Sequence, residues 1–485
     1  MTEEKLKPTY DLIIGVKTLL KWRAVLNFDE ETITLDGATL PMCPPNPEKL
    51  MARRQYYQVS NSEFQEPTAT LDLQKRVVRI LDANYEKADL PAIVRTHSSH
   101  LTPVQQAELI LLLQEFEELF DGTLGTWQTP PVHLELKEGA TPYHGKAFPV
   151  PHIHKDTLKK EVERLEEIGV LKRQTESEWA SPTFIIPKKQ GTVRFISDFR
   201  EVNKRIKRKP FPIPKISTTI QEQTGFTYAT ALDLIMGYYN IRLDGDSQKI
   251  CTIILPWGKY SYMRLPMGVA CSPDIFQARM SHLMAALEFV KVYLDDLLLI
   301  TRGDWSDHLD CLRQVLTRLQ KAGLRVNAAK SSFGKDEVEY LGYILCRHGI
   351  KPQPQKIQAI TALLPTKNVK QLRRFLGMVQ YYRDLWQKRS HILAPLTDLV
   401  GKCGHTKSTK KKGTVKKPWH WDAEHQAAFE MVKQKLARDV ILAYPDYDEV
   451  FEIYTDASTV QLGGVIVQKD RPIAFFSRKL SDPQT

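Results

Sequence analysis

Short apolar runs and amphipathic stretches follow one another along the chain from about residue 100 onward. Apolar runs bounded by turn-forming or charged residues predict strands, here over 181–189, 192–200, 228–234, 249–257, 260–266, 289–296 and 297–302. Apolar residues spaced three or four apart predict helices, here over 102–120, 155–171, 272–289, 305–323 and 369–386. The first helix opens with Thr102, Pro103 and Gln105, the spacing of a capping box. Because these elements mix without regular alternation, we expect an α+β fold with antiparallel hairpins.

The two ends of the chain have patterns of their own. Residues 10–37 predict a short strand, a helix-like stretch and a hairpin over 26–37, a piece too small to fold alone. Residues 38–95 are polar and rich in proline, which is typical of a linker. Residues 448–458 and 463–479 predict the first strands of a further sheet, and the chain ends at Thr485. At 485 residues the chain is long enough for about three domains.

The net charge of +11 favours an acidic partner, of which nucleic acid is the commonest, although a solvated basic surface fits the total equally well. Between Lys188 and Lys215 there are ten basic residues against two acidic ones, which indicates a phosphate-binding surface. A second run, 402–417, holds seven lysines and no acid, but its low complexity favours a solvated loop.

The cysteine content and the lack of long apolar runs restrict the compartment. None of the six cysteines has C-x-x-C spacing, so the cysteines predict no zinc site and are expected to be buried, reduced thiols. Reduced thiols indicate a reducing, intracellular compartment. The N-terminus lacks the apolar core of a signal peptide, and no run is long and apolar enough to predict a membrane span.

Adjacent acids in an apolar context are the strongest chemical signal in the sequence. Asp295 and Asp296 lie between two apolar runs, where carboxylates are costly unless they are paired or bound to a cation. A hairpin with the acids at its tip would present them to a metal ion. Asp233, 62 residues before Asp295, ends another strand-like run and can join them. Three converging carboxylates suit two Mg²⁺ ions, which catalyse nucleotidyl transfer, whereas the alternative interpretation is an ordinary Asp-containing β-turn.

Five further segments carry a family resemblance together with Tyr293-Leu294-Asp295-Asp296. They are Leu232-Asp-Leu-x-x-Gly-Tyr238, Arg194 to Lys204, Leu265-Pro-Met-Gly268, Ser272-Pro-x-x-Phe-Gln277 and Leu341-Gly342-Tyr343. In their order along the chain these segments resemble the motifs of reverse transcriptases over roughly residues 140–350. Phe375 to Tyr382, Trp421 with Ala428-Phe429, and Thr455-Asp-Ala-Ser458 resemble the Gypsy-type (Metaviridae) LTR retrotransposon polyprotein in particular. The sequence departs from the family at Tyr239, usually His, and at Met267, often Phe or Gln, which leaves nucleotide preference open.

The resemblance implies a role for each matched residue. Asp233 and Asp295 would ligate both metal ions and Asp296 would support one, with Mn²⁺ an alternative to Mg²⁺. Lys188 and Arg194 would contact the triphosphate, Tyr238 would exclude a 2′-hydroxyl, and Met267 and Gly268 would line the nucleotide pocket. The other implied roles are a proton donor, Lys330, and a primer grip, Leu341, Gly342 and Tyr343.

The resemblance also assigns the flanking segments. Residues 1–40 resemble the end of a retropepsin-like aspartic protease, but contain no Asp-Thr/Ser-Gly triplet. Residues 446–485 resemble the start of a ribonuclease H domain with Asp456 as its single identified metal ligand. We therefore expect neither protease nor ribonuclease H activity. Between them we expect a linker (41–95), a right-hand polymerase of fingers, palm and thumb (96–350) and a thumb and connection region (351–445), followed by the partial ribonuclease H-like α/β domain.

The implied function is an RNA-directed DNA polymerase of a retrotransposon. The resemblance also implies an intracellular location, either cytoplasmic in a virus-like particle or nuclear. Its partners would be an RNA template, a DNA or tRNA primer, RNA–DNA hybrid and dNTPs, with no membrane partner and a homodimer left open. The alternative from another class is a catalytically dead nucleic-acid-binding remnant of a degraded element. A group II intron-type or telomerase-like polymerase is disfavoured by the Gypsy-type segments.

Overall fold

The computed structural model describes residues 25–27, 32–35, 38–41, 87–187, 193–223, 225–403, 419–437, 441–458 and 461–480. The chain divides into two compact units, Met1–Arg76 and Val77–Thr485. In the first unit, β1 (Val25–Asn27), β2 (Thr32–Leu35) and β3 (Ala38–Pro41) form an antiparallel sheet. The hairpin predicted over 26–37 is therefore present as β1 and β2. Both β3 and the start of a helix at Leu90 fall within the polar stretch 38–95.

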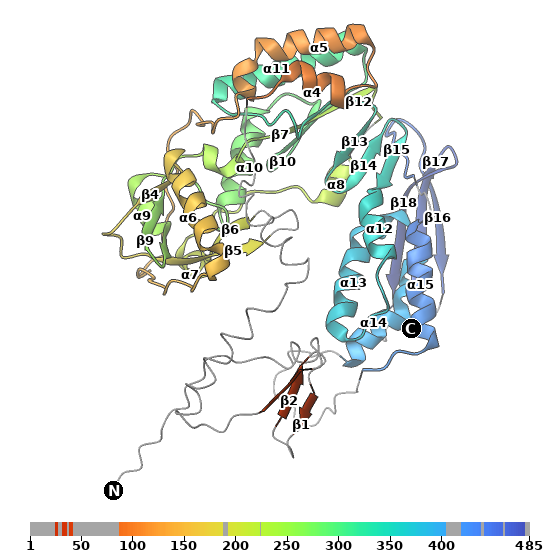
Figure 1. The fold of residues 1–485 in the computed structure, drawn as a ribbon. Coiled ribbons are helices and arrows are strands. Elements are labelled where there is room, and N and C mark those ends of the chain that lie inside the picture. Colours follow the sequence, from red (N-terminus) through yellow and green to blue (C-terminus); the bar gives the residue numbers. More distant parts are fainter. Residues whose placement is uncertain are drawn as a thin grey trace. The chain divides into compact units, whose positions relative to one another are not determined.

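The second unit begins with a helical layer. α4 (Leu90–His97), α5 (Pro103–Glu115) and η1 (Glu117–Phe120) lead into it, and α11 (Trp305–Ala322) packs against α5 and η1 (Figure 1). The predicted capping box of α5 is present. The Thr102 side chain accepts a hydrogen bond from the backbone N–H of Gln105, and the Gln105 side chain accepts one from the backbone N–H of Thr102. The sequence signal thus fixed the start of this helix correctly.

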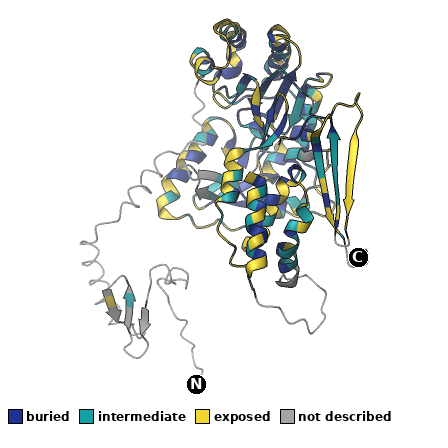
Figure 2. Cartoon of the chain, turned by 90° about the vertical axis from the view of Figure 1, so that its right-hand side faces the viewer, coloured by how far each residue is buried: buried dark blue, intermediate teal, exposed yellow. Residues whose placement is uncertain are grey.

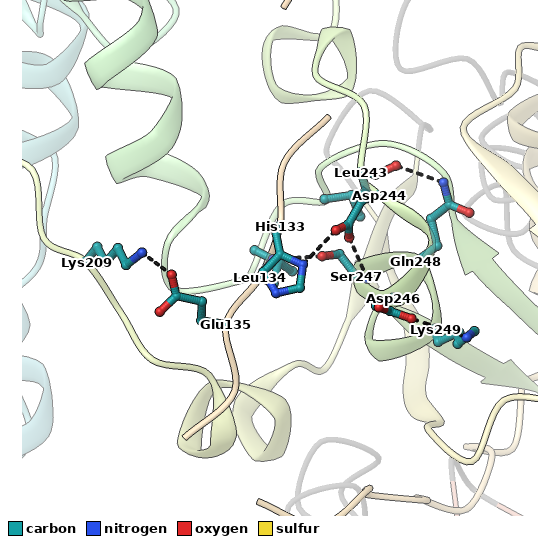
Figure 3. Close-up of polar contacts among 10 residues, drawn as sticks. All are labelled: His133, Leu134, Glu135, Lys209, Leu243, Asp244, Asp246, Ser247, Gln248 and Lys249. Atoms are coloured by element: carbon teal, nitrogen blue, oxygen red, sulfur yellow. Dashed lines mark hydrogen bonds and ion pairs between the residues drawn. The ribbon is translucent and has the colours of Figure 1, made fainter. Parts of the chain in front are cut away.

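A five-stranded sheet forms the region expected to be the fingers. Its order is β4-β9-β8-β5-β6, and its strands are β4 (Leu171–Arg173), β5 (Ser181–Pro187), β6 (Val193–Ser197), β8 (Thr252–Leu255) and β9 (Gly258–Tyr262). The accompanying helices are α6 (His152–Glu167), α7 (Arg200–Arg205) and α9 (Gly245–Ile250). Helix α8 (Ile216–Gln221) lies elsewhere, since its Ile220 belongs to the same hydrophobic core as Tyr343 and Ile350. Residues 132–136 are fastened beside α9 by a His133–Asp244 contact of 2.6 Å and a Leu134 N–H to Ser247 Oγ bond of 2.7 Å (Figure 3).

Several predicted boundaries in this unit were wrong. The strand predicted over 249–257 starts only at Thr252, because Asp244 accepts from the backbone N–H of Ser247 and begins α9 in its place. The helix predicted over 155–171 starts at His152, directly after Pro151, and ends at Glu167 so that Leu171 enters β4. The helix predicted over 272–289 ends at Leu283, since Ala286 adopts a left-handed backbone conformation of φ 65°.

The central sheet has the order β10-β11-β7-β12, with β7 (Tyr228–Asp233), β10 (Val290–Tyr293), β11 (Asp296–Thr301) and β12 (Ser332–Lys335). α10 (Ser272–Leu283) packs on β10, and α11 packs on β7 and β11. Leu297 and Leu299 join one hydrophobic core, while Leu298 and Ile300 join another. Because alternate side chains of a strand point to opposite faces, β11 is buried on both faces. This double burial holds the sheet between two cores.

The second core lies under two smaller sheets and a set of helices. The sheets are β13 (Glu337–Tyr340), β14 (Tyr343–Cys346) and β15 (Gly349–Pro352), and β16 (Glu452–Ala457), β17 (Gln461–Gln468) and β18 (Arg471–Lys479). The helical elements are α12 (Pro354–Thr361), α13 (Val369–Tyr381), η3 (Arg383–Leu385), α14 (Arg389–Cys403) and α15 (Ala423–Ala437). β16 is an edge strand exposed along its whole length (Figure 2). In the part of the chain that the structure describes, no helix has the length and apolar character needed to cross a membrane.

Candidate active site

Two strands of the central sheet bring the predicted carboxylates together. β7 ends at Asp233 and β11 begins at Asp296, and these two residues are register partners in the antiparallel pair. Tyr293 pairs with Asp296 across the β10–β11 hairpin, which leaves Leu294 and Asp295 as a two-residue turn. Leu294 has a φ of 54°, the left-handed conformation that such tight hairpin turns require. The tandem acids therefore occupy the tip of a hairpin, with the third acid directly across from one of them.

Asp295 lies beside the segment that follows β7. A Cβ atom placed on Gly237 would be 3.4 Å from the Cβ of Asp295 and 3.9 Å from its Oδ2. Gly237 begins η2 (Gly237–Asn240), three residues after β7 and its extension at Leu234. A side chain at position 237 would occupy the space between η2 and the carboxylate, so glycine permits the close approach.

Charge and burial raise the proton affinity of these acids. Burial is the largest cause of the raised pKa of Asp233, and the charge of Asp295 raises it further, while Lys330 opposes the shift. Burial raises the pKa of Asp296 to about 6, with Asp295 and Asp233 adding to the effect. Carboxylates that raise one another's pKa are stabilised as anions by a shared cation.

The donor set fits hard divalent cations, since Mg²⁺ and Mn²⁺ prefer carboxylate oxygen. Among the described residues, three or more His, Cys, Asp or Glu side chains bring ligand atoms within 4.8 Å of one another in another part of the fold. Asp233, Asp295 and Asp296 do not form such a group. The oxygens of Asp233, Asp295 and Asp296 are therefore wider apart, and a shared ion would require these side chains to turn inward. Strand pairing holds the backbones of Asp233 and Asp296 side by side, and the turn holds Asp295 next to Asp296.

Gln277, on α10, supports the turn that carries Asp295. Its Oε1 accepts a hydrogen bond of 2.7 Å from the backbone N–H of Leu294, and its Nε2 donates to the carbonyl of Val292 at 3.2 Å. The side chain is buried, with 1% of the residue exposed. Sequence analysis placed Gln277 in a motif but assigned it no role. Its only sequence signal is a polar residue beside Phe276 on the buried face of a helix.

Tyr238 and its surroundings form one wall beside the acids. The Tyr238 ring packs on Phe276 with centroids 5.1 Å apart. Burial raises the pKa of Tyr238 to about 12, and the charge of Asp295 contributes. The phenol therefore stays neutral near neutral pH and remains close to the turn.

The Met267–Gly268 segment is held by a residue of the fingers motif. Met267 is 57% exposed, and Gly268 has a φ of 92°. Asn203 donates to the carbonyl of Gly268 at 2.8 Å and accepts from the N–H of Ala270 at 2.8 Å. A Cβ on Gly268 would lie 3.4 Å from the carbonyl oxygen of Ser197, so this loop lies against β6. Asn203 belongs to the motif Arg194 to Lys204, but the sequence did not reveal that its side chain connects Gly268 and Ala270.

Lys330 and Leu341 of the predicted primer grip lie in a cleft with two of the acids. Asp233, Asp296, Lys330 and Leu341 line one cleft of about 430 Å³. Leu341 and Gly342, with φ of 47° and 77°, form the tight turn between β13 and β14. The Tyr381 hydroxyl donates to the carbonyl of Leu341. That turn therefore has a fixed position next to two of the three carboxylates.

Asp456 is not joined to this cluster, and the structure does not test the expected roles of Lys188 and Arg194. Lys188 lies outside the described residues, and Arg194 is described as the β6 partner of Ile186 without its side chain. Asp456 lies on the exposed strand β16, opposite Gly463, in a separate sheet.

Family models match two parts of the chain. Residues 186–345 match "Reverse transcriptase (RNA-dependent DNA polymerase)", and residues 421–485 match "RNase H-like domain found in reverse transcriptase". Among curated relatives, the Pol polyproteins of the Drosophila melanogaster transposons 297 and opus are 29% and 33% identical over 98% and 81% of this chain. The polyprotein of the gypsy transposon of the same species is 32% identical over 71% of the chain. The chain spans 34–42% of the length of these three relatives.

Solved structures share the fold. A foamy viral protease-reverse transcriptase in complex with double-stranded DNA has a TM-score of 0.74 at 22% identity, covering 84% of this chain and 83% of that chain. A second structure, of the same protein described as dRH, has a TM-score of 0.74 at 21% identity and covers 93% of this chain and 76% of that chain. The predicted α+β right-hand polymerase fold with a ribonuclease H-like domain is thereby confirmed.

Proposed function

We propose that this chain, which carries a reverse transcriptase domain and a ribonuclease H-like domain and is a relative of Gypsy-type LTR retrotransposon Pol polyproteins, is an RNA-directed DNA polymerase. Asp296 paired with Asp233, with Asp295 on the adjoining turn, is the observation that carries the proposal. The polymerase would occupy residues 96–350. Its partners would be a nucleic-acid template and primer, since foamy viral relatives in fold are described with double-stranded DNA and with RNA/DNA hybrid.

Divalent metal ions are used by reverse transcriptases generally, and here Asp233, Asp295 and Asp296 would hold them. When bound, two such ions activate the primer 3′-hydroxyl and stabilise charge on the departing pyrophosphate. The three carboxylates lose their mutual repulsion in that state. Lys188 and Arg194 would bind the triphosphate, and Lys330, which lines one cleft with Asp233 and Asp296, is the candidate proton donor.

Tyr238 would select the sugar. The neutral phenol lies beside Asp295 and is backed by Phe276, so its ring cannot retreat from an incoming nucleotide without displacing a buried side chain. A 2′-hydroxyl would collide with the ring, whereas deoxyribose would pack on it. Met267 and Gly268 would form the neighbouring wall of the nucleotide pocket.

The central experiment is primer extension on an RNA template with dNTPs and Mg²⁺. Wild type should extend the primer, and Asp295→Asn should lower the rate by about 100- to 1,000-fold, since removing one group that stabilises the transition state costs that much in comparable cases. Asp310→Asn, on the exposed side of α11, is the matched control and should extend normally. Equal product from Asp295→Asn and wild type would overturn the proposal, and salt-dependent binding without extension would favour the non-catalytic remnant instead.

A second experiment tests the sugar wall. Tyr238→Val should raise incorporation of ribonucleotides relative to deoxyribonucleotides by about 10-fold or more, because a steric clash of a few kcal/mol is removed. The ratio of kcat/KM for the two sugars is the measured quantity. An unchanged ratio in an active variant would remove Tyr238 from this role.

A further inference from the structure

A cluster of metal-binding side chains lies at the start of α15, within the second core region. The segment Trp419-His420-Trp421-Asp422 leads into the helix, and His425 lies in its first turn. His420, Asp422 and His425 each offer a ligand atom, and all three atoms lie within 4.8 Å of one another. The spacing His-x-Asp-x-x-His places one ligand ahead of the helix, one at its N-cap position and one inside it.

Aromatic packing holds the imidazole rings in place. His425 is 7% exposed, and the His420 ring meets it edge-on, with centroids 5.3 Å apart and an interplanar angle of 86°. The ring centroids of Trp421 and His425 lie 5.8 Å apart, and the Trp421 ring also packs on Phe429. The Nε1–H of Trp421 donates a hydrogen bond to Gln426 Oε1 at 2.9 Å. Ligands whose rings are fixed by packing lose little conformational freedom when an ion binds.

Helix capping explains part of this arrangement. Asp422 Oδ1 accepts from the backbone N–H groups of Glu424 and His425 at 3.1 and 3.2 Å, and contacts His425 Nδ1 at 2.5 Å. An Asp at the N-cap needs no histidine beyond the helix, and the capping contacts involve no atom of His420. Capping therefore leaves the approach of His420 to the other two ligands unexplained.

We propose that His420, Asp422 and His425 form a binding site for a Zn²⁺-type transition-metal ion. Two imidazoles and one carboxylate are a donor set that Zn²⁺ accepts at tetrahedral geometry and that Mg²⁺ disfavours. Asp422 is 55% exposed on its side chain, so water can supply the fourth ligand. The spacing of the cysteines excludes a thiolate site only and has no bearing on this one.

The ion would stabilise the fold and take no part in nucleotidyl transfer. His420 precedes α15, whereas His425 is buried among residues that pack on the second core. An ion bound by both histidines would therefore fix the segment 419–422 against α15. The site shares no residue with the Asp233–Asp296 pair, and its presence does not depend on polymerase activity.

The test uses the full chain, stripped of metal by a chelator and then titrated with Co²⁺ in excess Mg²⁺, which occupies hard oxygen sites. Wild type should develop the visible d–d absorption of tetrahedral Co²⁺ at one ion per chain, and Zn²⁺ should displace it and raise Tm. His420→Gln should weaken binding by at least about 10-fold, since even outer-shell changes cost that much. His391→Gln, an exposed histidine on α14, should bind as wild type does.

Asp422→Asn separates metal binding from capping, because Asn caps helices as well as Asp does but is a poor ligand. In chelator its Tm should match wild type, while the Zn²⁺-dependent rise in Tm should disappear. Absence of the Co²⁺ absorption in wild type would overturn the site. So would equal affinity in wild type, His420→Gln and Asp422→Asn, which would place the ion elsewhere.

Discussion

Lowering the pH should loosen the sheet that carries the acids, through His308. This residue of α11 is completely buried, and its Nε2 and Nδ1 lie 2.9 and 2.8 Å from the hydroxyls of Thr230 on β7 and Thr301 on β11. Each hydroxyl can donate or accept, so a neutral imidazole is satisfied in either tautomer. Burial lowers the pKa of His308 to about 4. Protonation therefore places a charge with no counter-charge in the core, next to the two strands that end and begin at Asp233 and Asp296.

The sign and size follow from linkage. The unfolded chain takes up a proton as pH falls through about 6.5, whereas the folded chain resists until about pH 4, so stability is full above pH 6.5 and is lost between these values. The complete loss is about 3 kcal/mol, and the part lost between pH 7.5 and pH 5 is about 2 kcal/mol. This is a large share of the stability of an ordinary domain.

Hydrogen exchange of peptides from β7 and β11 measures this effect locally, which avoids assuming that so long a chain unfolds in one step. Wild type should lose about 2 kcal/mol more opening free energy than His308→Asn between pH 7.5 and pH 5, because the variant has no imidazole to protonate. His152→Asn, at an exposed position on α6, should retain the wild-type loss. Equal losses in wild type and His308→Asn would refute the reasoning.

Three substitutions test the support of the site. Gln277→Met removes the acceptor for the buried N–H of Leu294, which costs about 1–3 kcal/mol, and should lower kcat of primer extension about 10- to 100-fold; kcat within twofold of wild type would contradict it. Gly237→Ala adds a Cβ 3.4 Å from the Cβ of Asp295, so kcat should fall about 10-fold while Tm stays nearly constant. A fall in Tm without a fall in kcat would contradict a role of Gly237 in placing Asp295. Gly342→Ala places a side chain at φ 77° against Tyr381, so thermal melting should show a loss of about 1–2 kcal/mol or more, and an unchanged Tm would be inconsistent with the turn described.

Local signals predicted most element positions well. The capping box at Thr102 marked the start of α5, and the amphipathic run 305–323 matches α11, Trp305–Ala322. The prediction failed where a cap outweighed an apolar run, as at Asp244, whose hydrogen bond to Ser247 turns the beginning of a predicted strand into α9. Four of the nine residues in the run 249–257 are β-branched, including Ile250 inside the helix, so its composition concealed the helix end.

The site was less accessible to such reasoning, because its support comes from distant contacts. Tyr293 to Asp296 is a local hairpin, and the tandem acids at its tip were visible in the sequence. Gln277 reaches that turn from 17 residues away, and Asn203 reaches Ala270 from 67 residues away, without periodicity or spacing that reveals either contact. The family resemblance identified the motifs that contain Gln277 and Asn203. The hydrogen-bond partners of these two side chains are visible only in the structure.

The pairing of Asp233 with Asp296 depends on a property that the sequence conceals. Strands buried on both faces lack polar alternation, so the run 296–301 does not disclose its register. In the structure Leu297 faces Leu232 in one core, and Ile300 faces Ala229 in the other. A shift of one residue in the β7–β11 register would move each of these side chains to the wrong core. The same shift would separate Asp296 from its register partner Asp233. The same packing that stabilises the sheet therefore sets the distance between the acids, and core substitutions in β7 or β11 that shift the register should lower metal-dependent activity without touching a carboxylate.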